Sequence, residues 1–420
     1  MAGLGSLGER AVSGDADPVC WIAVAASAGD RQVAAAGRRV DAGFDVTLLD
    51  IDPETQRRYY DVVSNQTLWF SHHGLFDSSR EPSFDDDWFD SWAAYRSVNA
   101  RFAESIAETA AVGAVVLVQD YHLALVGRLL GRLRPDLASV HFHHTPFATP
   151  DEMAMLPDQV RDELLDGLRG HTACGFHTQR WASRLDGVPT FAAPLGIDAA
   201  ALRASASSAE CEAEVAQLRE LVGDRQLIAR VDRIELSKNL IRGFDAFDQL
   251  LRRDASLRER VVFAAFCYPS REGVAAYGRY RLDVEARVAE INSRWSTSDW
   301  TPILWEGDDD YPRSLAALRV CDVLMVNPIR DGLNLVAVEG SILNEVDGSL
   351  VLSSECGAAA QLGDCADVVS PFDVSATTTA LATGLTRSAD QRSTQAAQRR
   401  NGALVRTPDA WLADQLHAAG

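Results

Sequence analysis

The stretch at residues 323–343 constrains the fold of this chain more than any other. It opens with the apolar run VLMV, which predicts a short buried strand, and continues as NPIRDGLNLVAVE over residues 327–339. A helix is predicted over residues 335–343. A strand, a glycine-containing loop and a helix N-terminus are how α/β proteins hold phosphate, because free N–H groups and the positive end of the helix dipole face the anion. The stretch therefore predicts an α/β fold with an anion site at this turn.

Side chains in the same loop suit a sugar as well as a phosphate. Gly332 lets the backbone turn tightly and approach a ligand. Asp331 and Glu339 are poor partners for a phosphate but good acceptors for sugar hydroxyls. The loop is therefore predicted to bind a nucleotide sugar. The alternative is an ordinary strand–helix connection in which Arg330 and Asp331 form a solvated ion pair.

Composition and charge narrow the class of protein. A chain of 420 residues that is 47% hydrophobic exceeds one ordinary core, so two domains are expected. The net charge of −20 argues against a nucleic-acid partner, because binding a phosphate backbone needs clustered basic residues. The seven cysteines are scattered without a CxxC pair, which favours a reducing cytoplasm. No apolar run approaches the roughly 18 residues of a membrane span, so no membrane partner is expected.

Short apolar runs alternate with helical segments along two halves of the chain. Strands are predicted at 19–26, 44–49, 114–118, 140–144 and 172–176, and then at 227–231, 261–266, 303–305, 323–326 and 350–352. The alternation predicts two doubly wound, Rossmann-like α/β domains facing a central cleft. We expect a disordered N-terminus (1–18), an acceptor-side domain (19–200) with a C-terminal helix (407–420) packing back onto it, and a nucleotide-sugar domain (201–406) that opens with a helical linker (201–222).

Capping residues and hydrophobic spacing predict several helices. Asp52 starts a helix to about residue 62, and a capping box at Thr149 and Glu152 starts another to about residue 168. The acidic run at 85–87 is predicted to be a solvated loop. Apolar faces define a helix at 92–109 (Trp92, Tyr95, Val98, Phe102 and Ile106) and a last helix after Thr407 (Trp411, Leu412 and Leu416).

Polar residues follow strands of the first half, where open α/β sheets bind their ligands. Asp120 lies in QDYH after the run at 114–118, and His144 ends the run at 140–144. Eight of the nine histidines fall between residues 72 and 177, so a zinc or iron site is an alternative. On a strand, however, His141 and His143 point one way and His144 the other, and no HExxH motif accompanies them. We therefore expect His144 to hydrogen-bond a substrate hydroxyl, and we expect no metal.

A basic loop, RVDRIELSKN, follows the predicted strand at 227–231. Arg230 and Lys238 are expected to converge on a diphosphate, because fixed cations stabilise the charge that develops on such a leaving group without a metal. Lys238 is the only lysine of the chain and lies inside this loop. No GxxxxGK[ST] motif is present, which excludes a P-loop NTPase. The alternative for Arg230 is a surface ion pair.

Taken in order, a series of short motifs resembles the trehalose-phosphate synthases, which are retaining glycosyltransferases of the GT-B fold. The resemblance covers residues 64–412, and each motif is weak alone but specific in this order. The motifs are SNQTLW, WAAYRSVNARFA, QDYHLAL, HTPFATPDEM, GFHTQRW, PLGID, RVDRIELSKN, PSREGVAAY, NPIRDGLNLVAVE, LSSECGAAAQLG and SPFD.

The resemblance implies roles for particular residues. Arg230 and Lys238 would hold the donor diphosphate, and Glu339 the donor ribose. The transferred sugar would lie against Asp331, His144 and the backbone of Gly332, Leu333, Asn334 and Leu335. The residues that fall on the acceptor side are Asp120, Trp92, Gly74 and Arg271. The catalytic set is then Arg230, Lys238, His144 and Asp331.

Departures from the family pattern concern the acceptor. The arginine before the first strand is missing, and SAGDRQVAA replaces the glycine-pair loop. Gly74 stands where the family has a tyrosine, and Lys238 follows Arg230 by eight residues, a longer spacing. These changes predict a larger pocket and an acceptor that is not a sugar phosphate. The altered N-terminus is also similar to that of the validamycin-pathway pseudo-glycosyltransferase, a relative that uses a GDP-linked cyclitol.

The sequence thus predicts a cytoplasmic, metal-independent, retaining glycosyltransferase that moves a sugar from a nucleoside diphosphate sugar, with GDP favoured. A scarcity of lysine resembles actinobacterial proteins, so the acceptor is predicted to be an amine, thiol or hydroxyl in natural-product (antibiotic) biosynthesis. One alternative is a genuine trehalose-6-phosphate synthase that uses glucose 6-phosphate. A catalytically inactive nucleotide-sugar-binding protein and a histidine-rich metalloenzyme are the others. The expected partners are small molecules, and a homo-oligomer is left open.

Overall fold

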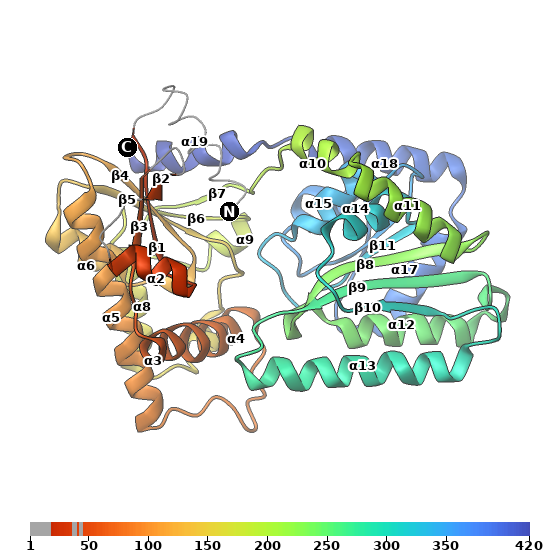
Figure 1. The fold of residues 1–420 in the computed structure, drawn as a ribbon, viewed down its shortest axis with the longest axis horizontal. Coiled ribbons are helices and arrows are strands. Elements are labelled where there is room, and N and C mark those ends of the chain that lie inside the picture. Colours follow the sequence, from red (N-terminus) through yellow and green to blue (C-terminus); the bar gives the residue numbers. More distant parts are fainter. Residues whose placement is uncertain (1–17, 36–39, 42–44) are drawn as a thin grey trace. The chain divides into compact units, whose positions relative to one another are not determined.

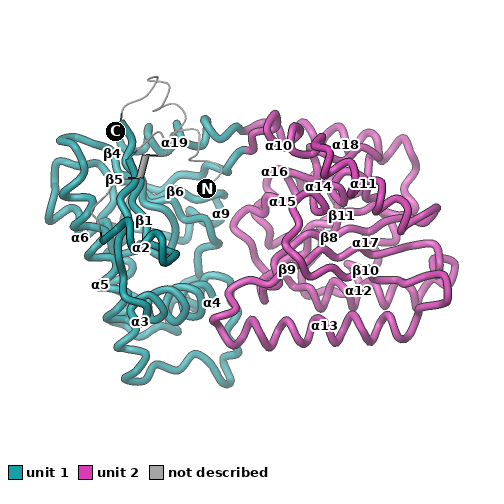
Figure 2. The backbone as a smooth tube through the Cα atoms, viewed as in Figure 1, with its two compact units in different colours: residues 1–196, 407–420 teal, residues 197–406 magenta. Residues whose placement is uncertain are grey.

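The computed structural model describes residues 18–35, 40–41 and 45–420. The predicted disordered N-terminus, residues 1–18, lies outside this range apart from Pro18. The chain divides into two compact units, which Figure 2 shows in separate colours. Unit 1 comprises Met1–Gly196 and Thr407–Gly420, and unit 2 comprises Ile197–Arg406.

Unit 1 contains two β-sheets (Figure 1). In the first, β1 (Cys20–Val24) runs parallel to β3 (Asp45–Leu49), and β2 (Val40–Asp41) pairs antiparallel with β3. The second sheet is parallel and has the order β4-β5-β6-β7, with bounds Val115–Gln119, Ala138–His143, Ala173–Phe176 and Thr190–Ala192. The predicted runs at 19–26, 44–49, 114–118, 140–144 and 172–176 are therefore confirmed as strands, with ends shifted by up to two residues.

Helices fill the rest of unit 1 (Figure 1). They are α2 (Ala28–Ala35), α3 (Pro53–Arg57), the π-helix η1 (Arg58–Leu68), α4 (Trp69–His73), α5 (Asp86–Thr109), the 3-10 helix η2 (Tyr121–Leu123), α6 (Val126–Leu133), α7 (Pro150–Met153), α8 (Asp158–Arg169), α9 (Gln179–Ala182) and α19 (Pro408–Ala419). The capping box at Thr149 and Glu152 and the cap at Asp52 are confirmed.

Two predicted helix boundaries in unit 1 are wrong. The helix from Asp52 does not stop near residue 62 but continues through η1 and α4, because Val63, Leu68 and Phe70 are buried and extend its apolar side. The acidic run at 85–87 is not a loop. Asp85 accepts a hydrogen bond from the N–H of Trp88 at 2.9 Å and caps α5, whose first turn holds the other two carboxylates near the positive helix end.

Two other predictions for unit 1 need correction. The helix predicted from Thr149 to residue 168 is broken into α7 and α8 before Pro157, which lacks the N–H needed to continue a helix. In α19, Trp411 and Leu412 are buried beside Phe142 of β5, but Leu416 is 40% exposed and is not buried with them. The five apolar residues predicted for the helix at 92–109 are all buried, as expected.

Unit 2 is built on one parallel six-stranded sheet with the order β10-β9-β8-β11-β12-β13. The strands are β8 (Gln226–Ile234), β9 (Val261–Pro269), β10 (Ile303–Glu306), β11 (Val323–Val326), β12 (Ser349–Ser353) and β13 (Asp367–Val369). The chain first adds strands on one side of β8 and then returns to add β11 on the other. This is the doubly wound arrangement, whose ligands bind where the strand order reverses, at the carboxyl ends of the strands.

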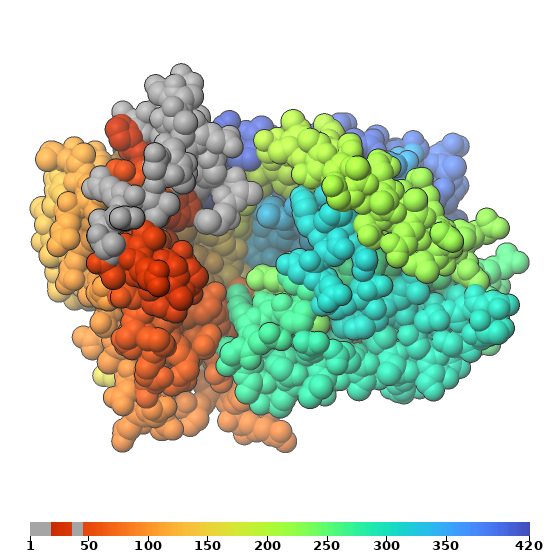
Figure 3. All heavy atoms as spheres, in the orientation of Figure 1, coloured from red at the N-terminus to blue at the C-terminus, as the bar shows by residue number. Residues whose placement is uncertain are grey.

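Helices cover both faces of this sheet (Figure 1). They are α10 (Ala199–Ala206), α11 (Ala209–Val222), η3 (Leu236–Lys238), α12 (Leu240–Arg253), η4 (Ala255–Leu257), α13 (Ala275–Trp295), α14 (Tyr311–Val320), α15 (Leu335–Leu343), α16 (Ala359–Leu362), η5 (Gly363–Cys365), α17 (Val374–Thr386) and α18 (Ala389–Ala403). The segment of α10 and α11, predicted to be a helical linker, packs onto the core of unit 2 through the buried side chains of Leu202, Cys211 and Leu218. Figure 3 shows them as a yellow-green ridge on its surface.

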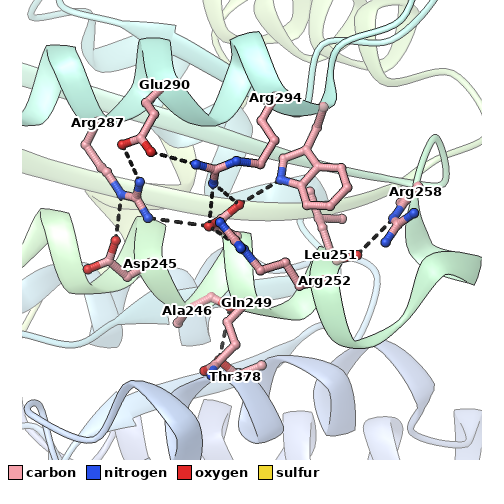
Figure 4. A network of polar contacts seen from close by, with 12 residues as sticks. Asp245, Ala246, Gln249, Leu251, Arg252, Arg258, Arg287, Glu290, Arg294 and Thr378 are labelled. Atoms are coloured by element: carbon pink, nitrogen blue, oxygen red, sulfur yellow. Dashed lines mark hydrogen bonds and ion pairs between the residues drawn. The ribbon is translucent and has the colours of Figure 1, made fainter.

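A charged network fastens α13 to α12 (Figure 4). Asp248 of α12 is 3% exposed and accepts hydrogen bonds from Arg252 (3.0 Å), Arg294 (2.8 Å) and the indole N–H of Trp295 (2.7 Å). Arg287 reaches the same carboxylate at 3.4 Å and Asp245 at 2.6 Å. Burial alone would raise the pKa of Asp248, but hydrogen bonds from Trp295, Arg294 and Arg252 outweigh it and lower the pKa.

None of the helices in the described part of the chain combines the length and the hydrophobicity that a membrane span requires.

Candidate functional site

Polar residues gather in unit 2 where the strand order of its sheet reverses, between β8 and β11. β8 covers the predicted strand at 227–231, which includes Arg230, and continues to Ile234. Lys238 ends the short helix η3 that follows β8. Asp331 lies in the loop between β11 and α15, whose predicted bounds are confirmed. Parallel pairing of Val323 with Ile228 brings the carboxyl ends of the two strands to the same edge of the sheet.

Arg230 is fully buried, so a surface ion pair is excluded for it. Its Nε donates to Asp232 Oδ2 at 3.1 Å, its Nη1 donates to Asn327 Oδ1 at 2.7 Å, and its Nη2 donates to the carbonyl oxygen of Lys238. A Cβ on Gly243 of α12 would lie only 2.5 Å from Nη1, so this position needs glycine. The predicted direct contact of Arg230 with a diphosphate does not fit this conformation, because the guanidinium has no exposed surface. Arg230 instead supports the backbone that carries Lys238.

Lys238 is the cation at the centre of the site. Its Nζ lies 2.9 Å from Asp331 Oδ2 and 3.3 Å from Asp232 Oδ1, and its side chain is 12% exposed. Burial alone would lower the pKa of Lys238, but the carboxylates of Asp331 and Asp232 outweigh it and raise the pKa. The ammonium therefore stays charged throughout the physiological pH range.

A second cation, which the sequence reasoning missed, is Arg233. Its side chain is 41% exposed and lies 3.1 Å from Glu235 Oε1. Its positive charge opposes the effect of the two carboxylates on the pKa of Lys238. Side chains of a strand alternate between its faces, so Arg230 and Arg233 point to opposite sides of β8. This alternation of strand side chains, applied to the sequence RVDRI, is the signal that could have separated the buried Arg230 from the exposed Arg233.

The loop before α15 is held in a defined shape by its own side chains. Asp331 Oδ1 accepts the N–H of Leu333 at 3.3 Å, and Oδ2 accepts Asn334 Nδ2 at 3.2 Å. Asn334, with φ of 75°, caps α15 by accepting the N–H of Ala337 at 3.1 Å. Gly332, Leu333 and Asn334 are buried, and Leu335 is the first residue of the helix. The positive end of α15 therefore follows directly on the loop, as an anion site requires.

A neighbouring segment, residues 355–358, supports this loop and was also missed. The N–H of Asp331 donates to the Glu355 carbonyl at 3.1 Å, and the N–H of Gly357 returns a bond to the Asp331 carbonyl at 3.0 Å. The N–H of Ala358 donates to the Leu333 carbonyl at 2.7 Å. A Cβ on Gly357 would lie 1.9 Å from the Gly332 carbonyl oxygen, so only glycine allows this approach. The SECG motif therefore shapes the predicted sugar loop.

Glu339 lies one turn into α15 and is half-buried. Burial raises the pKa of its carboxyl group. Its carboxylate makes no hydrogen bond or ion pair with any other residue that the structure describes. Such a group suits the predicted contact with ribose hydroxyls, because two hydroxyl donors would replace the water lost on burial.

Arg271 belongs to unit 2, together with the donor residues, rather than to the first half of the chain. Its backbone has φ of 51°, and its Nη1 donates to the Tyr277 hydroxyl at 2.9 Å. The same nitrogen lies 3.5 Å from Glu235 Oε1, the atom that also holds Arg233. Glu235 is fully buried and receives a further bond from Ser270 at 3.0 Å. One carboxylate thus aligns both arginines.

The other predicted acceptor-side residues lie in unit 1. Asp120, in the left-handed region with φ of 68°, accepts the backbone N–H of His144 at 3.1 Å. Trp92 is 3% exposed, stacks on Tyr95 with 5.0 Å between ring centroids, and donates its indole N–H to Glu163 at 3.1 Å. In this conformation Trp92 is a buried residue, and its predicted contact with the acceptor stays a prediction. Gly74 ends α4 in the left-handed conformation, with φ of 64°.

The histidines of unit 1 point as the strand period predicts. His141 Nε2 lies 3.5 Å from His143 Nδ1, whereas His144 turns to the opposite face and meets His177 and Gln119. His143 also lies 2.8 Å from the Thr145 hydroxyl. No group of three or more metal-ligating side chains occurs in the part of the chain that the structure describes. His141 and His143 are buried core residues.

Comparison with known proteins gives consistent results over most of the chain. The sequence profile of Glycosyltransferase family 20 matches residues 9–185 and 182–419. A trehalose-6-phosphate synthase of Mycolicibacterium vanbaalenii is 32% identical over 410 residues, which is 90% of this chain and 82% of that protein. A bifunctional trehalose-6-phosphate synthase/phosphatase of Thermoproteus tenax is 30% identical over 373 residues, which is 83% of this chain, and the chain spans half of its length.

Solved structures agree with this result. The crystal structure of an alpha,alpha-trehalose-phosphate synthase (UDP-forming) from Burkholderia vietnamiensis superposes with a TM-score of 0.86 at 26% identity. The match covers 96% of this chain and 99% of that one. The GT-B fold expected from the sequence motifs is thereby confirmed.

Proposed function

Since the chain belongs to glycosyltransferase family 20, we propose that it transfers glucose from a nucleoside diphosphate glucose to glucose 6-phosphate, the trehalose-6-phosphate synthase reaction. The chain is a glycosyltransferase, and this finer assignment rests on the names of its relatives. It takes precedence over the natural-product acceptor and the GDP donor predicted from the sequence. UDP-glucose becomes the first donor to test, because a similar solved structure is described as UDP-forming.

The observation that supports the proposal is the pairing of Lys238 with Asp331 at the strand-order reversal of unit 2. Lys238 and the exposed Arg233 supply two fixed positive charges for the donor diphosphate. Asp331 and the loop it orders supply acceptors and N–H groups for the transferred sugar. Glu339, on the helix that follows, supplies a carboxylate for the ribose. One donor molecule would use all of these groups.

The proposed reaction is a front-face displacement that retains the anomeric configuration of the transferred sugar. The bond between the sugar C1 and the diphosphate oxygen breaks, and the acceptor hydroxyl oxygen forms a bond to C1 on the same face. The acceptor proton passes to the departing diphosphate oxygen, so nucleoside diphosphate and glycoside are the products. Lys238 and Arg233 lower the barrier by stabilising the negative charge as it develops. Asp331 is bonded to Lys238, Leu333 and Asn334, so a covalent role for its carboxylate is disfavoured.

The test is turnover of glucose 6-phosphate with UDP-, GDP- and ADP-glucose, followed by release of the nucleoside diphosphate and by identification of the disaccharide phosphate. The assay is run with and without EDTA, since two fixed cations are proposed to replace a metal. We expect turnover with one of the three donors and no loss in EDTA. Absence of turnover with all three donors would contradict the proposal.

A second candidate is transfer to an acceptor without phosphate, such as an amine, a thiol or a hydroxyl. The observation that favours it is Gly74, which offers no side chain where the resembled family has a tyrosine. The left-handed backbone at this position gives an independent reason for glycine, so the observation is weaker than the family evidence. The rate of donor consumption with and without glucose 6-phosphate decides between the two candidates. Only the first candidate predicts that glucose 6-phosphate accelerates donor consumption.

A further inference from the structure

Unit 1 holds a chain of hydrogen bonds that runs from a backbone amide through two histidines to the last helix. The N–H of Leu195 points at His177 Nδ1 at 3.3 Å. His177 Nε2 lies 3.3 Å from His144 Nδ1, and His144 Nε2 lies 2.9 Å from Gln119 Oε1. Gln119 Nε2 in turn donates to Gln415 Oε1 of α19 at 3.2 Å.

The first member of this chain determines the direction of every bond. A backbone N–H can only donate, so His177 Nδ1 is an acceptor and the proton of the neutral ring sits on Nε2. That N–H donates to His144 Nδ1, which leaves the His144 proton on Nε2, where Gln119 Oε1 accepts it. The Gln119 amide then turns its NH2 group toward Gln415. One tautomer of each imidazole satisfies the whole chain.

The far end of the chain is held by the C-terminal helix. Gln415 is fully buried, and its Nε2 has no hydrogen-bond partner among the described residues. Trp411, one turn earlier on the same face of α19, packs on Phe142 with 5.0 Å between ring centroids and on His144 with 5.7 Å. Helix α19 therefore contacts His144 directly through an indole and indirectly through two amides. Burial and the adjacent His177 lower the pKa of His144 well below its usual range, which agrees with a neutral ring.

We propose that His177, Gln119 and Gln415 are positioning residues that hold His144 as a neutral imidazole with its proton on Nε2. This inference rests on the proposed function and on the contact with the transferred sugar that the sequence resemblance implies for His144. Both ring nitrogens are engaged, so in this conformation His144 has no lone pair with which to take the acceptor proton and no free ring N–H for the substrate hydroxyl predicted from the sequence. His144 then acts as an oriented group and not as a general base, and the proton goes to the departing diphosphate.

The test is ¹⁵N NMR of the full chain labelled at histidine, with His144 assigned by its loss in His144→Gln. We expect a protonated, pyrrole-type Nε2 and an unprotonated, pyridine-type Nδ1, both unchanged between about pH 6 and 9. In Gln415→Leu the Gln119 amide is released and can turn its NH2 toward the ring, so the two signals move toward a tautomer mixture. The matched control is Leu416→Gln, which alters the adjacent, 40% exposed position of the same helix.

Steady-state measurements of kcat and KM provide a second test of the proposal. Gln415→Leu is expected to lower kcat severalfold with little change in KM for the donor, whereas Leu416→Gln changes neither. Gln119→Glu keeps an oxygen that accepts from Nε2, so His144 should keep the wild-type tautomer. Its carboxylate also raises the pKa of His144, so an acid limb should appear in the pH profile of kcat.

Three results would overturn the inference. They are a wild-type proton on Nδ1, a charged His144 near neutral pH, and unchanged His144 signals and kcat in Gln415→Leu. If Gln415→Leu does not fold, the wild-type spectrum and Gln119→Glu still decide. Because the NMR signals need no substrate, failure of the turnover assay would reject the proposed function without affecting this test.

Discussion

The ammonium of Lys238 lies 2.9 Å from Asp331 Oδ2, and this ion pair joins the loops that follow β8 and β11. Both side chains are mostly buried, at 12% and 19% exposure, so water screens the pair less than it would at a surface. A donor diphosphate would compete with Asp331 for the same ammonium. We expect donor binding to loosen the ion pair and release the carboxylate toward the sugar hydroxyls.

Nucleoside diphosphates should stabilise the protein through Lys238. A ligand at 100 times its Kd adds about 2.7 kcal/mol, which corresponds to several degrees at roughly 2–4 °C per kcal/mol. A metal-free thermal shift with UDP, GDP and ADP should show this for one base in the wild type and much less in Lys238→Ala. The control is Arg279→Ala, at an exposed position of α13. A mutant that responds like the wild type would remove Lys238 from the donor site.

Arg230 and Arg233 should have separable effects. Arg230→Ala removes one of the two cations that pair with the buried Asp232 and takes the donor from Asn327 Oδ1, so we expect a loss of about 3–5 kcal/mol in the free energy of unfolding. Arg233→Ala removes a 41% exposed cation, so stability should change by less than about 0.5 kcal/mol while kcat falls at least about tenfold. Urea unfolding midpoints and initial rates measure the two quantities. The opposite pattern would return the catalytic role to Arg230.

Gly357→Ala should impair donor binding. The new Cβ would lie 1.9 Å from the Gly332 carbonyl oxygen, so the sugar loop has to move. We expect KM for the donor to rise at least about tenfold, equivalent to about 1.4 kcal/mol. Gly278→Ala in α13 is the matched control, because its Cβ would meet no atom within 4 Å and should stabilise the helix slightly. Equal KM values in the two variants would show that the Gly357 contact is not needed.

Asp248 should matter for stability rather than for catalysis. Asp248→Asn keeps the shape but removes the charge that three arginines share, so we expect a loss of about 2 kcal/mol in the free energy of unfolding. Asp245→Asn, which removes one partner of Arg287, should cost less than about 1 kcal/mol. Urea unfolding at low and high salt measures both. Equal losses would show that the indole and arginine contacts of Asp248 contribute little.

Buried histidines should make the protein sensitive to acid. Burial lowers the pKa of His141 and His143 well below 6.5 and that of His171 to about 3. Above pH 6.5 these rings are neutral whether the chain is folded or unfolded, so they add no pH dependence there. Between pH 6.5 and about 3 the unfolded chain binds more protons than the folded chain. The free energy of unfolding therefore decreases as the pH is lowered, by up to about 1.4 kcal/mol per pH unit for each ring.

Urea midpoints measured from about pH 7 down to 5 test this slope. His171→Gln, which keeps a polar group near Ser139 but cannot be protonated, should flatten it. A wild-type midpoint that does not change over this range would show that the buried rings charge without cost.

Much of the fold follows from local patterns. Runs such as 323–326 are strands because four apolar residues between polar segments are too few for a helix and suit a parallel sheet that is buried on both faces. The bounds of β11 and α15 were predicted to the residue. Helix ends were less predictable. The continuation of the Asp52 helix to His73 depends on burial of Val63 and Leu68 against other parts of unit 1, which local propensity does not contain.

The sequence by itself determined the family, the α/β architecture and the two loops that carry Lys238 and the pair Asp331–Gly332, because spacing and capping are local properties of the chain. Only the tertiary structure decided which arginine is exposed. Arg230 and Arg233 are identical side chains three residues apart, and the pleat of β8 with the close approach of Gly243 buries the first. The hydrogen bonds that link Leu195 through His144 to Gln415 could not be predicted either, because these residues lie far apart in the sequence. Hydrogen bonds between residues far apart in sequence exist only once the sheet and α19 have come together.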